Sequence, residues 1–179
     1  LHSGQTFTDV TWDAWCEDRQ ATAVPGALDF VQVALSRGVA VYFVSNRSAA
    51  VEQATRDNLA ALGFGAALRD DVDTVLLKGE RPEWRSAKST RLAHVAADHT
   101  IVMLVGDNLG DFTDDYLTSP AARAAFVDEN RGRWGEEWIM LPNPPYGSWM
   151  SALFAHDWST PPAAQADAVL ESLRTWPGP

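Results

Sequence analysis

The chain has 179 residues, of which 46% are hydrophobic and 21% charged, and this length and composition suit one globular domain with a sizeable core. The formal net charge of −10 argues against a nucleic-acid polymer as partner, because proteins that bind such polymers carry a basic face. The single cysteine, Cys16, excludes an intrachain disulfide, and no apolar run reaches the length of a membrane span.

The first elements expected along the chain are two helices. Trp12, Trp15 and Cys16 have the i, i+3, i+4 spacing of one face of a short helix, on which the tryptophans either pack in the core or line a substrate cleft. The range 27–37 has helical periodicity. Pro25 precedes it and a glycine at position 38 suits its end.

Four short apolar runs predict buried strands at 39–44, 73–77, 100–105 and 137–141. Helical patterns separate these runs. The alternation predicts an α/β fold with a doubly wound, mainly parallel sheet flanked by helices. In such sheets, ligands bind outside the carboxyl ends of the strands, so the polar residues that follow each run are the candidate site residues.

An acidic loop follows the strand expected at 100–105, in the sequence IVMLVGDNLGDF. Gly106 permits a sharp turn, and Asp107 and Asp111 offer carboxylate oxygens of the kind that Mg²⁺ prefers. The alternative is a plain turn in which an aspartate caps the next helix.

Ser45 and Lys88 are the candidate phosphate-binding residues. Ser45 lies between the strand expected at 39–44 and the helix expected at 49–62, where a hydroxyl and backbone N–H groups bind an anion or simply cap the helix. Lys88 lies in the first turn of the helix expected at 86–97, where the helix dipole disfavours a cation. It therefore points at a phosphate or a carboxylate, unless it is an ordinary exposed lysine.

A proline-rich loop after the strand expected at 137–141 carries Tyr146 and Trp149, either as a structural wrap or as an aromatic wall. Together with Trp12 and Trp15, these rings are expected to reach the phosphate edge of the sheet. Two aromatic walls beside a phosphate suit a flat base that is joined to a 5′-phosphate.

In their order, these segments resemble the class C acid phosphatases of the haloacid dehalogenase superfamily, and among them the lipoprotein e type, also described as 5′-nucleotidases. The likeness covers nearly the whole chain. It rests on the motifs WxxW…AVPGA, FVSNR, NLxxLGF, LLK…SxKxxR, VGDNLGDF, FVxxN and MLPNPxYGxW. The resemblance implies a haloacid dehalogenase-like, Rossmannoid phosphatase domain over 1–155 and a peripheral tail over 156–179, where 163–173 is amphipathic.

The resemblance further implies a Mg²⁺-dependent phosphomonoesterase that hydrolyses small phosphate esters, with nucleoside 5′-monophosphates as the expected substrates. Ser45 and Lys88 would be catalytic, with Lys78 as the alternative to Lys88. Asp107 would be a Mg²⁺ ligand. Asp111 would be either a second ligand or a carboxylate that supports the ligands without binding the ion itself. Substrate-binding roles are expected for Asn46, Arg47, Trp15 and Tyr146.

One motif of the family is absent from this sequence. Its D-x-D-E-T segment supplies the aspartate nucleophile and the acid/base aspartate, and alignment places it shortly upstream of Leu1. Asp9 and Asp13 do not follow an apolar strand and are no replacements. We therefore expect the nucleophile upstream of Leu1, and the alternative is a non-catalytic phosphate- or nucleotide-binding module on the same fold.

By the same resemblance, the partner is a small-molecule phosphomonoester and the location is secreted, periplasmic or at the cell surface. A link to the membrane is expected only through an N-terminal anchor outside this sequence. A homodimer is one option for the assembly.

Overall fold

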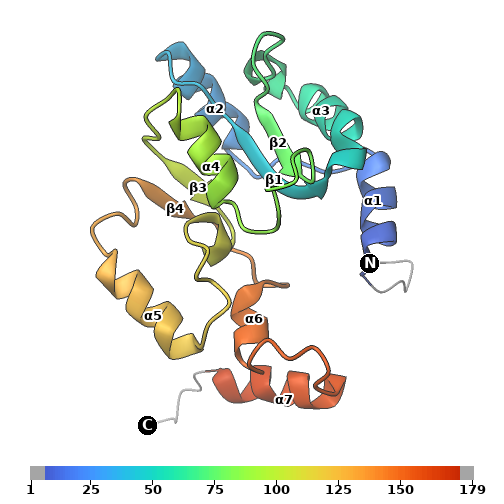
Figure 1. Ribbon diagram of the computed structural model, residues 1–179, viewed down its shortest axis with the longest axis vertical. Coiled ribbons are helices and arrows are strands. Elements are labelled where there is room, and N and C mark those ends of the chain that lie inside the picture. Colours follow the sequence, from blue (N-terminus) through green and yellow to red (C-terminus); the bar gives the residue numbers. More distant parts are fainter. Residues whose placement is uncertain (1–6, 174–179) are drawn as a thin grey trace. The chain divides into compact units, whose positions relative to one another are not determined.

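The computed structural model describes residues 7–173, which fall into two compact units divided between Ser86 and Ala87 (Figure 1). The first unit contains, in chain order, α1 (Asp9–Glu17), α2 (Ala27–Ser36), β1 (Phe43–Ser48), the 3-10 helix η1 (Ala49–Val51), α3 (Glu52–Ala61), the 3-10 helix η2 (Phe64–Ala67) and β2 (Val75–Lys78). The second unit contains α4 (Ser89–Ala96), β3 (Leu104–Gly106), the 3-10 helix η3 (Leu109–Asp111), α5 (Pro120–Glu129), β4 (Trp138–Met140), α6 (Ser148–Ala152) and α7 (Pro162–Ser172).

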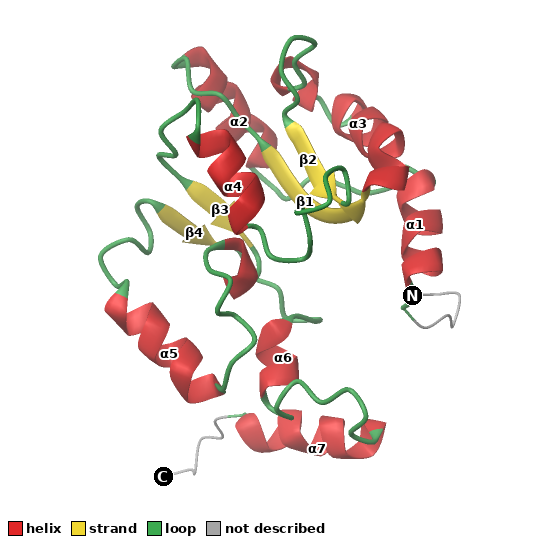
Figure 2. Cartoon of the chain, in the orientation of Figure 1, coloured by secondary structure: helices red, strands yellow, loops and turns green. Residues whose placement is uncertain are grey.

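The core of the first unit forms where α2 and η2 meet. Val31, Phe64 and Ala67 are buried there, and partly buried apolar side chains such as Leu28 pack against them. β1 and β2 pair in parallel (Figure 2). Phe43 lies opposite Val75, and the apolar residues of β2 are fully buried. Burial of these apolar side chains is the main source of stability for such a layer.

Helix α1 joins this unit through Cys16, whose side chain is 1% exposed. Burial raises the pKa of the Cys16 thiol above its ordinary value, and the nearby Arg47 guanidinium offsets part of the rise. The sequence pattern that places Cys16 on one face of a short helix is confirmed, and this face is where the thiol is buried.

The second unit is built around aromatic rings and a second parallel strand pair, in which Leu104 lies opposite Trp138. The Phe112 and Trp134 rings meet edge to face with centroids 4.9 Å apart, and Phe126 stacks on Trp138 at 6.0 Å. Such ring pairs contribute about 0.5–1.5 kcal/mol each beyond the area that they bury. This cluster therefore fixes α5 against β4.

Ser119 and Pro120 in the sequence predict the start of a helix, and α5 begins there. The Ser119 hydroxyl accepts a hydrogen bond from the Ala122 N–H, and Pro120 occupies the first helical position. The amphipathic stretch at 163–173 is interpreted from the sequence as a peripheral helix or a partly ordered tail; helix α7 covers most of it, and none of the residues of α7 is buried. No helix among residues 7–173 is both long enough and apolar enough to cross a membrane.

The α/β class and the parallel direction of the strands are confirmed, although the described strands form two separate pairs, β1 with β2 and β3 with β4. The expected bounds of the first strand are wrong. β1 begins at Phe43, where β2 supplies a partner, and continues through a register shift to Ser48, so Ser45 lies within the strand and not at the start of a helix.

Burial of the run at 101–105 is also predicted wrongly. Only Leu104 and Val105 of this run are in β3, and Val102 and Val105 are 59% and 47% exposed. β3 pairs with β4 alone among the described strands.

Candidate active site

The acidic loop is organised around the carboxylate of Asp111. Its Oδ2 accepts hydrogen bonds from the backbone N–H groups of Asp107 and Asn108, each at 2.9 Å. Gly106 makes this closure possible, because a Cβ atom there would lie 2.4 Å from the Asp111 Cβ. The loop therefore needs glycine at this position for space.

Lys88 binds the other oxygen of the same carboxylate. Its Nζ lies 2.5 Å from Asp111 Oδ1, and the two side chains are only 17% and 12% exposed. Lys88 is the N-terminal cap residue of α4, where the dipole opposes a cation, and the Asp111 charge compensates for that position. The sequence prediction that Lys88 faces a carboxylate or a phosphate is confirmed for the carboxylate.

Asp107 differs from Asp111 in what its oxygens contact. Its Oδ2 accepts a hydrogen bond of 2.8 Å from Asn143 Nδ2, and its other oxygen has no hydrogen-bond partner among residues 7–173. Asp107 is exposed, whereas both oxygens of Asp111 are occupied by N–H groups and Lys88. Of the two carboxylates, Asp107 is the one that fits a metal ion, because it keeps a hard oxygen ligand available.

The proline-rich loop that begins at Asn143 lies against the acidic loop. The Trp149 ring N–H donates to the Asn143 carbonyl at 3.1 Å, which secures the residue that contacts Asp107. Tyr146 is 59% exposed on this loop. Partial burial raises the pKa of the Tyr146 phenol, and the negative charge of Asp107 raises it further, so the ring stays neutral at physiological pH.

The candidate residues of the first unit form a separate group. Arg47 donates to the Thr55 hydroxyl at 3.1 Å, and its guanidinium carbon lies 5.5 Å from the centroid of the Trp15 ring. Trp15 stacks on Trp12 with ring centroids 5.0 Å apart. This arrangement offers a flat aromatic surface beside a cation.

Ser45 and Asn46 are fixed by backbone contacts of the same unit. The Ser45 hydroxyl accepts a hydrogen bond from the Arg47 N–H at 3.2 Å, and Asn46 Nδ2 donates to the Ser86 carbonyl at 2.9 Å. Each unit therefore brings its own candidate residues together. That the two groups bind one phosphate stays a prediction.

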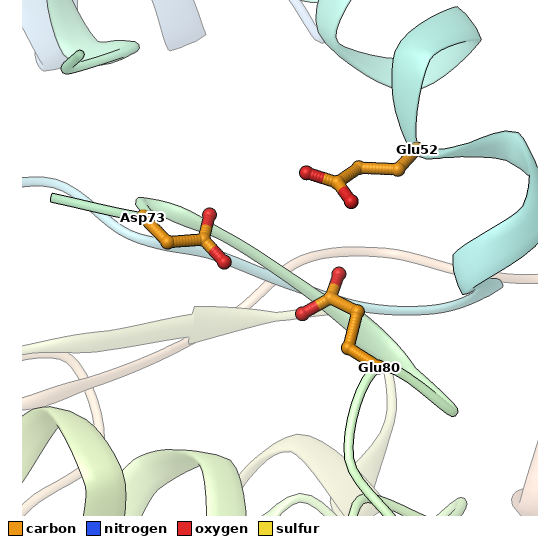
Figure 3. Close-up of side chains that lie close together, drawn as sticks. All are labelled: Glu52, Asp73 and Glu80. Atoms are coloured by element: carbon orange, nitrogen blue, oxygen red, sulfur yellow. The ribbon is translucent and has the colours of Figure 1, made fainter.

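A second acidic cluster lies in the first unit and was not predicted. Carboxylate oxygens of Glu52, Asp73 and Glu80 lie within 4.8 Å of one another (Figure 3). Arg56 donates to Glu52 at 2.7 Å and also to Asp73, while Glu80 accepts from the Leu77 N–H at 2.8 Å. A guanidinium thus already supplies positive charge where a metal ion would bring it. We therefore interpret the cluster as a structural network of ion pairs and hydrogen bonds.

A shallow cavity of about 330 Å³ lies beside α5. None of the predicted site residues lines it, and its lining consists of Leu109, Arg123, Ala124, Val127, Asp128 and Met140. The sequence interpretation also missed Asn143 and Ser148, which contact the acidic loop. Asn143 carried a usable signal, because it is the second residue after a predicted strand and the first polar one there.

Comparison with known proteins agrees with this α/β architecture. Residues 1–149 match the model of the HAD superfamily, subfamily IIIB (Acid phosphatase). Acid phosphatase 1 from Solanum lycopersicum is 26% identical over 142 residues, which are 79% of this chain and 49% of that protein. The chain thus spans about half the length of this curated relative.

Solved structures give the same relationship. The class C acid phosphatase from Bacillus anthracis matches with a TM-score of 0.82 and 31% identity, over 98% of this chain and 71% of that chain. A structure of the Bacillus anthracis enzyme with tungstate bound gives the same values. The fold is that of a haloacid dehalogenase-like α/β protein. The chain belongs to the HAD superfamily, subfamily IIIB, the acid phosphatases.

Proposed function

We propose that this chain carries much of the active site of a Mg²⁺-dependent acid phosphatase that hydrolyses small phosphomonoesters. The proposal rests on the different contacts that the two aspartates of the acidic loop make. Asp111 is engaged by Lys88 and two N–H groups, and Asp107 keeps an oxygen available for a metal ion. Membership of the acid phosphatase subfamily supports the same reaction class.

In this proposal, Asp107 would hold Mg²⁺, and the bound ion would neutralise charge that develops on the phosphoryl oxygens. Lys88 is held in place by its ion pair with Asp111 and stabilises the same phosphoryl group. Ser45 binds a phosphate oxygen through its hydroxyl, with Asn46 and Arg47 beside it. These groups bind, orient and neutralise, which is most of what phosphoryl transfer requires.

The nucleophile of the proposed reaction is an aspartate upstream of Leu1, as the family resemblance implies. Its carboxylate forms a bond to phosphorus while the bond to the leaving oxygen breaks, and a second aspartate protonates that oxygen. Water then hydrolyses the aspartyl-phosphate and releases inorganic phosphate. The family match supports this assignment.

For the substrate, we propose nucleoside 5′-monophosphates. Tyr146 and Trp15 are exposed rings of a kind that can stack on a base, and Trp12 stacks on Trp15. Tungstate, which is bound in a structure of the Bacillus anthracis relative, is a tetrahedral oxyanion like phosphate. By resemblance, we also propose a secreted, periplasmic or cell-surface location and a homodimer as one assembly.

The test uses the protein together with the residues encoded upstream of Leu1. Phosphate release from p-nitrophenyl phosphate and from adenosine 5′-monophosphate is measured with Mg²⁺ and after chelation by EDTA. We expect turnover that EDTA abolishes and Mg²⁺ restores. Binding of the nucleotide without any turnover would instead identify a non-catalytic nucleotide-binding module.

A further inference from the structure

Arg123, on α5, is a cation that the proposed chemistry does not use. It is half-buried and forms no ion pair among residues 7–173. Burial lowers the pKa of its guanidinium, because no carboxylate offsets the lost hydration. Instead, its Nη1 donates to the Tyr116 carbonyl at 2.6 Å and to the Ser148 hydroxyl at 3.0 Å. A half-buried guanidinium whose partners are all neutral costs free energy of desolvation. These contacts are therefore expected to serve a function.

Contact with Arg123 sets the direction of the next hydrogen bond. A guanidinium has only donors, so the oxygen of Ser148 must be the acceptor. The Ser148 hydroxyl proton is then free to point at Asn108 Oδ1, which lies 2.6 Å away. Ser148 is 8% exposed, so water does not readily replace this contact.

Asn108 connects this relay to the acidic loop. Its Oδ1 also accepts from the Gly110 N–H at 3.2 Å, and its own N–H donates to Asp111 at 2.9 Å. Asn108 therefore closes the turn between the two aspartates. The fit is close, because a Cβ atom on Gly147 would lie 3.1 Å from Asn108 Nδ2.

We propose that Arg123, acting through Ser148, is a positioning residue that holds Asn108 and thereby orients Asp107 for metal binding. This inference rests on the proposed function for the identity of the ion. Neither residue touches the phosphoryl group in this scheme. Their effect is on the geometry of the loop, and the order of action is Arg123, Ser148, Asn108.

The order of action predicts how substitutions combine. In the protein that includes the upstream residues, Ser148→Ala and Arg123→Gln are each expected to raise the Mg²⁺ concentration for half-maximal activity by about 10- to 100-fold, the range for partners behind a metal ligand. The double variant should lose no more than the worse single variant. Ser148→Thr keeps the hydroxyl and should restore most of the affinity, while KM for p-nitrophenyl phosphate at saturating Mg²⁺ stays within about twofold.

Ser159→Ala is the matched control, because the Ser159 hydroxyl bonds only within an exposed turn, to Asp157. It should change none of these values. Losses that multiply in the double variant would show that Arg123 and Ser148 act independently and would overturn the relay. An unchanged Mg²⁺ requirement in Ser148→Ala would overturn the proposal as a whole.

A second measurement does not depend on activity. Amide hydrogen exchange of the segment 107–111, measured without metal, should be faster in Ser148→Ala and Arg123→Gln than in Ser148→Thr and Ser159→Ala, while exchange in α1–α3 stays unchanged. Faster exchange throughout the chain would mean general destabilisation and would contradict a positioning role. If the complete protein shows no phosphatase activity, the proposed function fails, and this exchange pattern still decides whether the relay holds the loop.

Discussion

The protein contains two acidic sites that resemble each other in composition and differ in what their carboxylates contact. In the cluster of Glu52, Asp73 and Glu80, Arg56 bridges two carboxylates and a backbone N–H caps the third. In the acidic loop, Lys88 and two N–H groups engage Asp111 alone. Asp107 therefore keeps an oxygen available, and this difference makes the loop the better candidate for a metal site.

The comparison teaches that the number of nearby carboxylates does not identify a metal site. The cluster has more carboxylates within a short distance than the loop has. Yet its guanidinium already balances much of the charge, and Arg cannot be deprotonated under ordinary conditions. A metal ion would have to displace Arg56 from the cluster, whereas it would meet an available oxygen on Asp107.

The largest effect is expected from removing Asp107, the proposed metal ligand. Asp107→Asn should lower Mg²⁺-dependent turnover by about 1,000-fold or more, since a bound ion contributes several kcal/mol to stabilising the transition state. Glu52→Gln, the matched change in the cluster, should leave turnover within about twofold. Phosphate release at saturating Mg²⁺ measures both variants. A larger loss of turnover in Glu52→Gln than in Asp107→Asn would contradict the assignment of the metal site to the loop.

The next effect concerns the two lysines. Lys88→Ala should reduce turnover by about 100-fold, because in the proposed site it removes a charge beside the phosphoryl group. It should also destabilise the fold, since Asp111, 12% exposed, loses its ion-pair partner. Lys78→Ala, at the end of β2, is the control and should change little. Steady-state kinetics and thermal unfolding report the two effects, and a larger kinetic loss in Lys78→Ala would reassign the catalytic cation.

A third prediction concerns the loop that contacts Asp107. Tyr146→Ala should raise KM for a nucleoside 5′-monophosphate by about 5- to 150-fold if the ring stacks on the base, and barely change it for a small aliphatic phosphate. Tyr146→Phe should retain the nucleotide KM. Equal changes for the two substrates would mean that Tyr146 only supports its loop, and a broad-specificity phosphatase would then be the better description.

The smallest effect tests the acidic cluster through pH. Burial raises the pKa of Glu80 above its ordinary value of 4.5, the Leu77 N–H opposes the rise, and the charges of Asp73 and Glu52 add to it more than Arg56 subtracts. The native carboxyl therefore holds its proton more tightly than the unfolded one. Stability contributed by this group falls as pH rises from about 4.5 through the raised native pKa.

Glu80→Gln keeps the oxygen that accepts from Leu77 and removes this titration. The free energy of unfolding at pH 7 should increase by less than about 1 kcal/mol, because the side chain still partly reaches solvent. At about pH 4, where the native carboxyl is protonated, the variant should show no gain. Urea unfolding at the two pH values measures the difference, and a loss of stability at pH 7 would mean that the Glu80 charge is needed to hold Arg56.

Local patterns predicted the parts of the fold that depend on neighbouring residues. Ser119 and Pro120 marked the start of α5, because a cap and the first helical position involve residues three or fewer apart. Lys88 was predicted to need an anionic partner, because its place at the start of α4 is unfavourable for a cation. Both inferences rest on physics that acts within one turn of helix.

Contacts between distant residues could not be predicted in the same way. Ser148 and Asn108 are 40 residues apart in sequence, and Arg123 and Ser148 are 25 apart. The start of β1 at Phe43 depends on where β2 offers a partner, and the apolar run at 39–44 carries no mark of that register. The exposure of Val102 depends on which layers cover it, and hydrophobicity alone does not specify a layer.

The burial of Cys16 gives the first unit an internal reporter of its own opening. Thiol reagents react with the thiolate form of cysteine. While α1 stays docked, the Cys16 side chain is protected by its burial, at 1% exposure, and by its raised pKa, which lowers the thiolate fraction. Under conditions of rapid reclosing, the labelling rate equals the intrinsic rate multiplied by the opening equilibrium constant. Because the chain has a single cysteine, labelling has one site, and its rate reports the free energy of local undocking without any added probe.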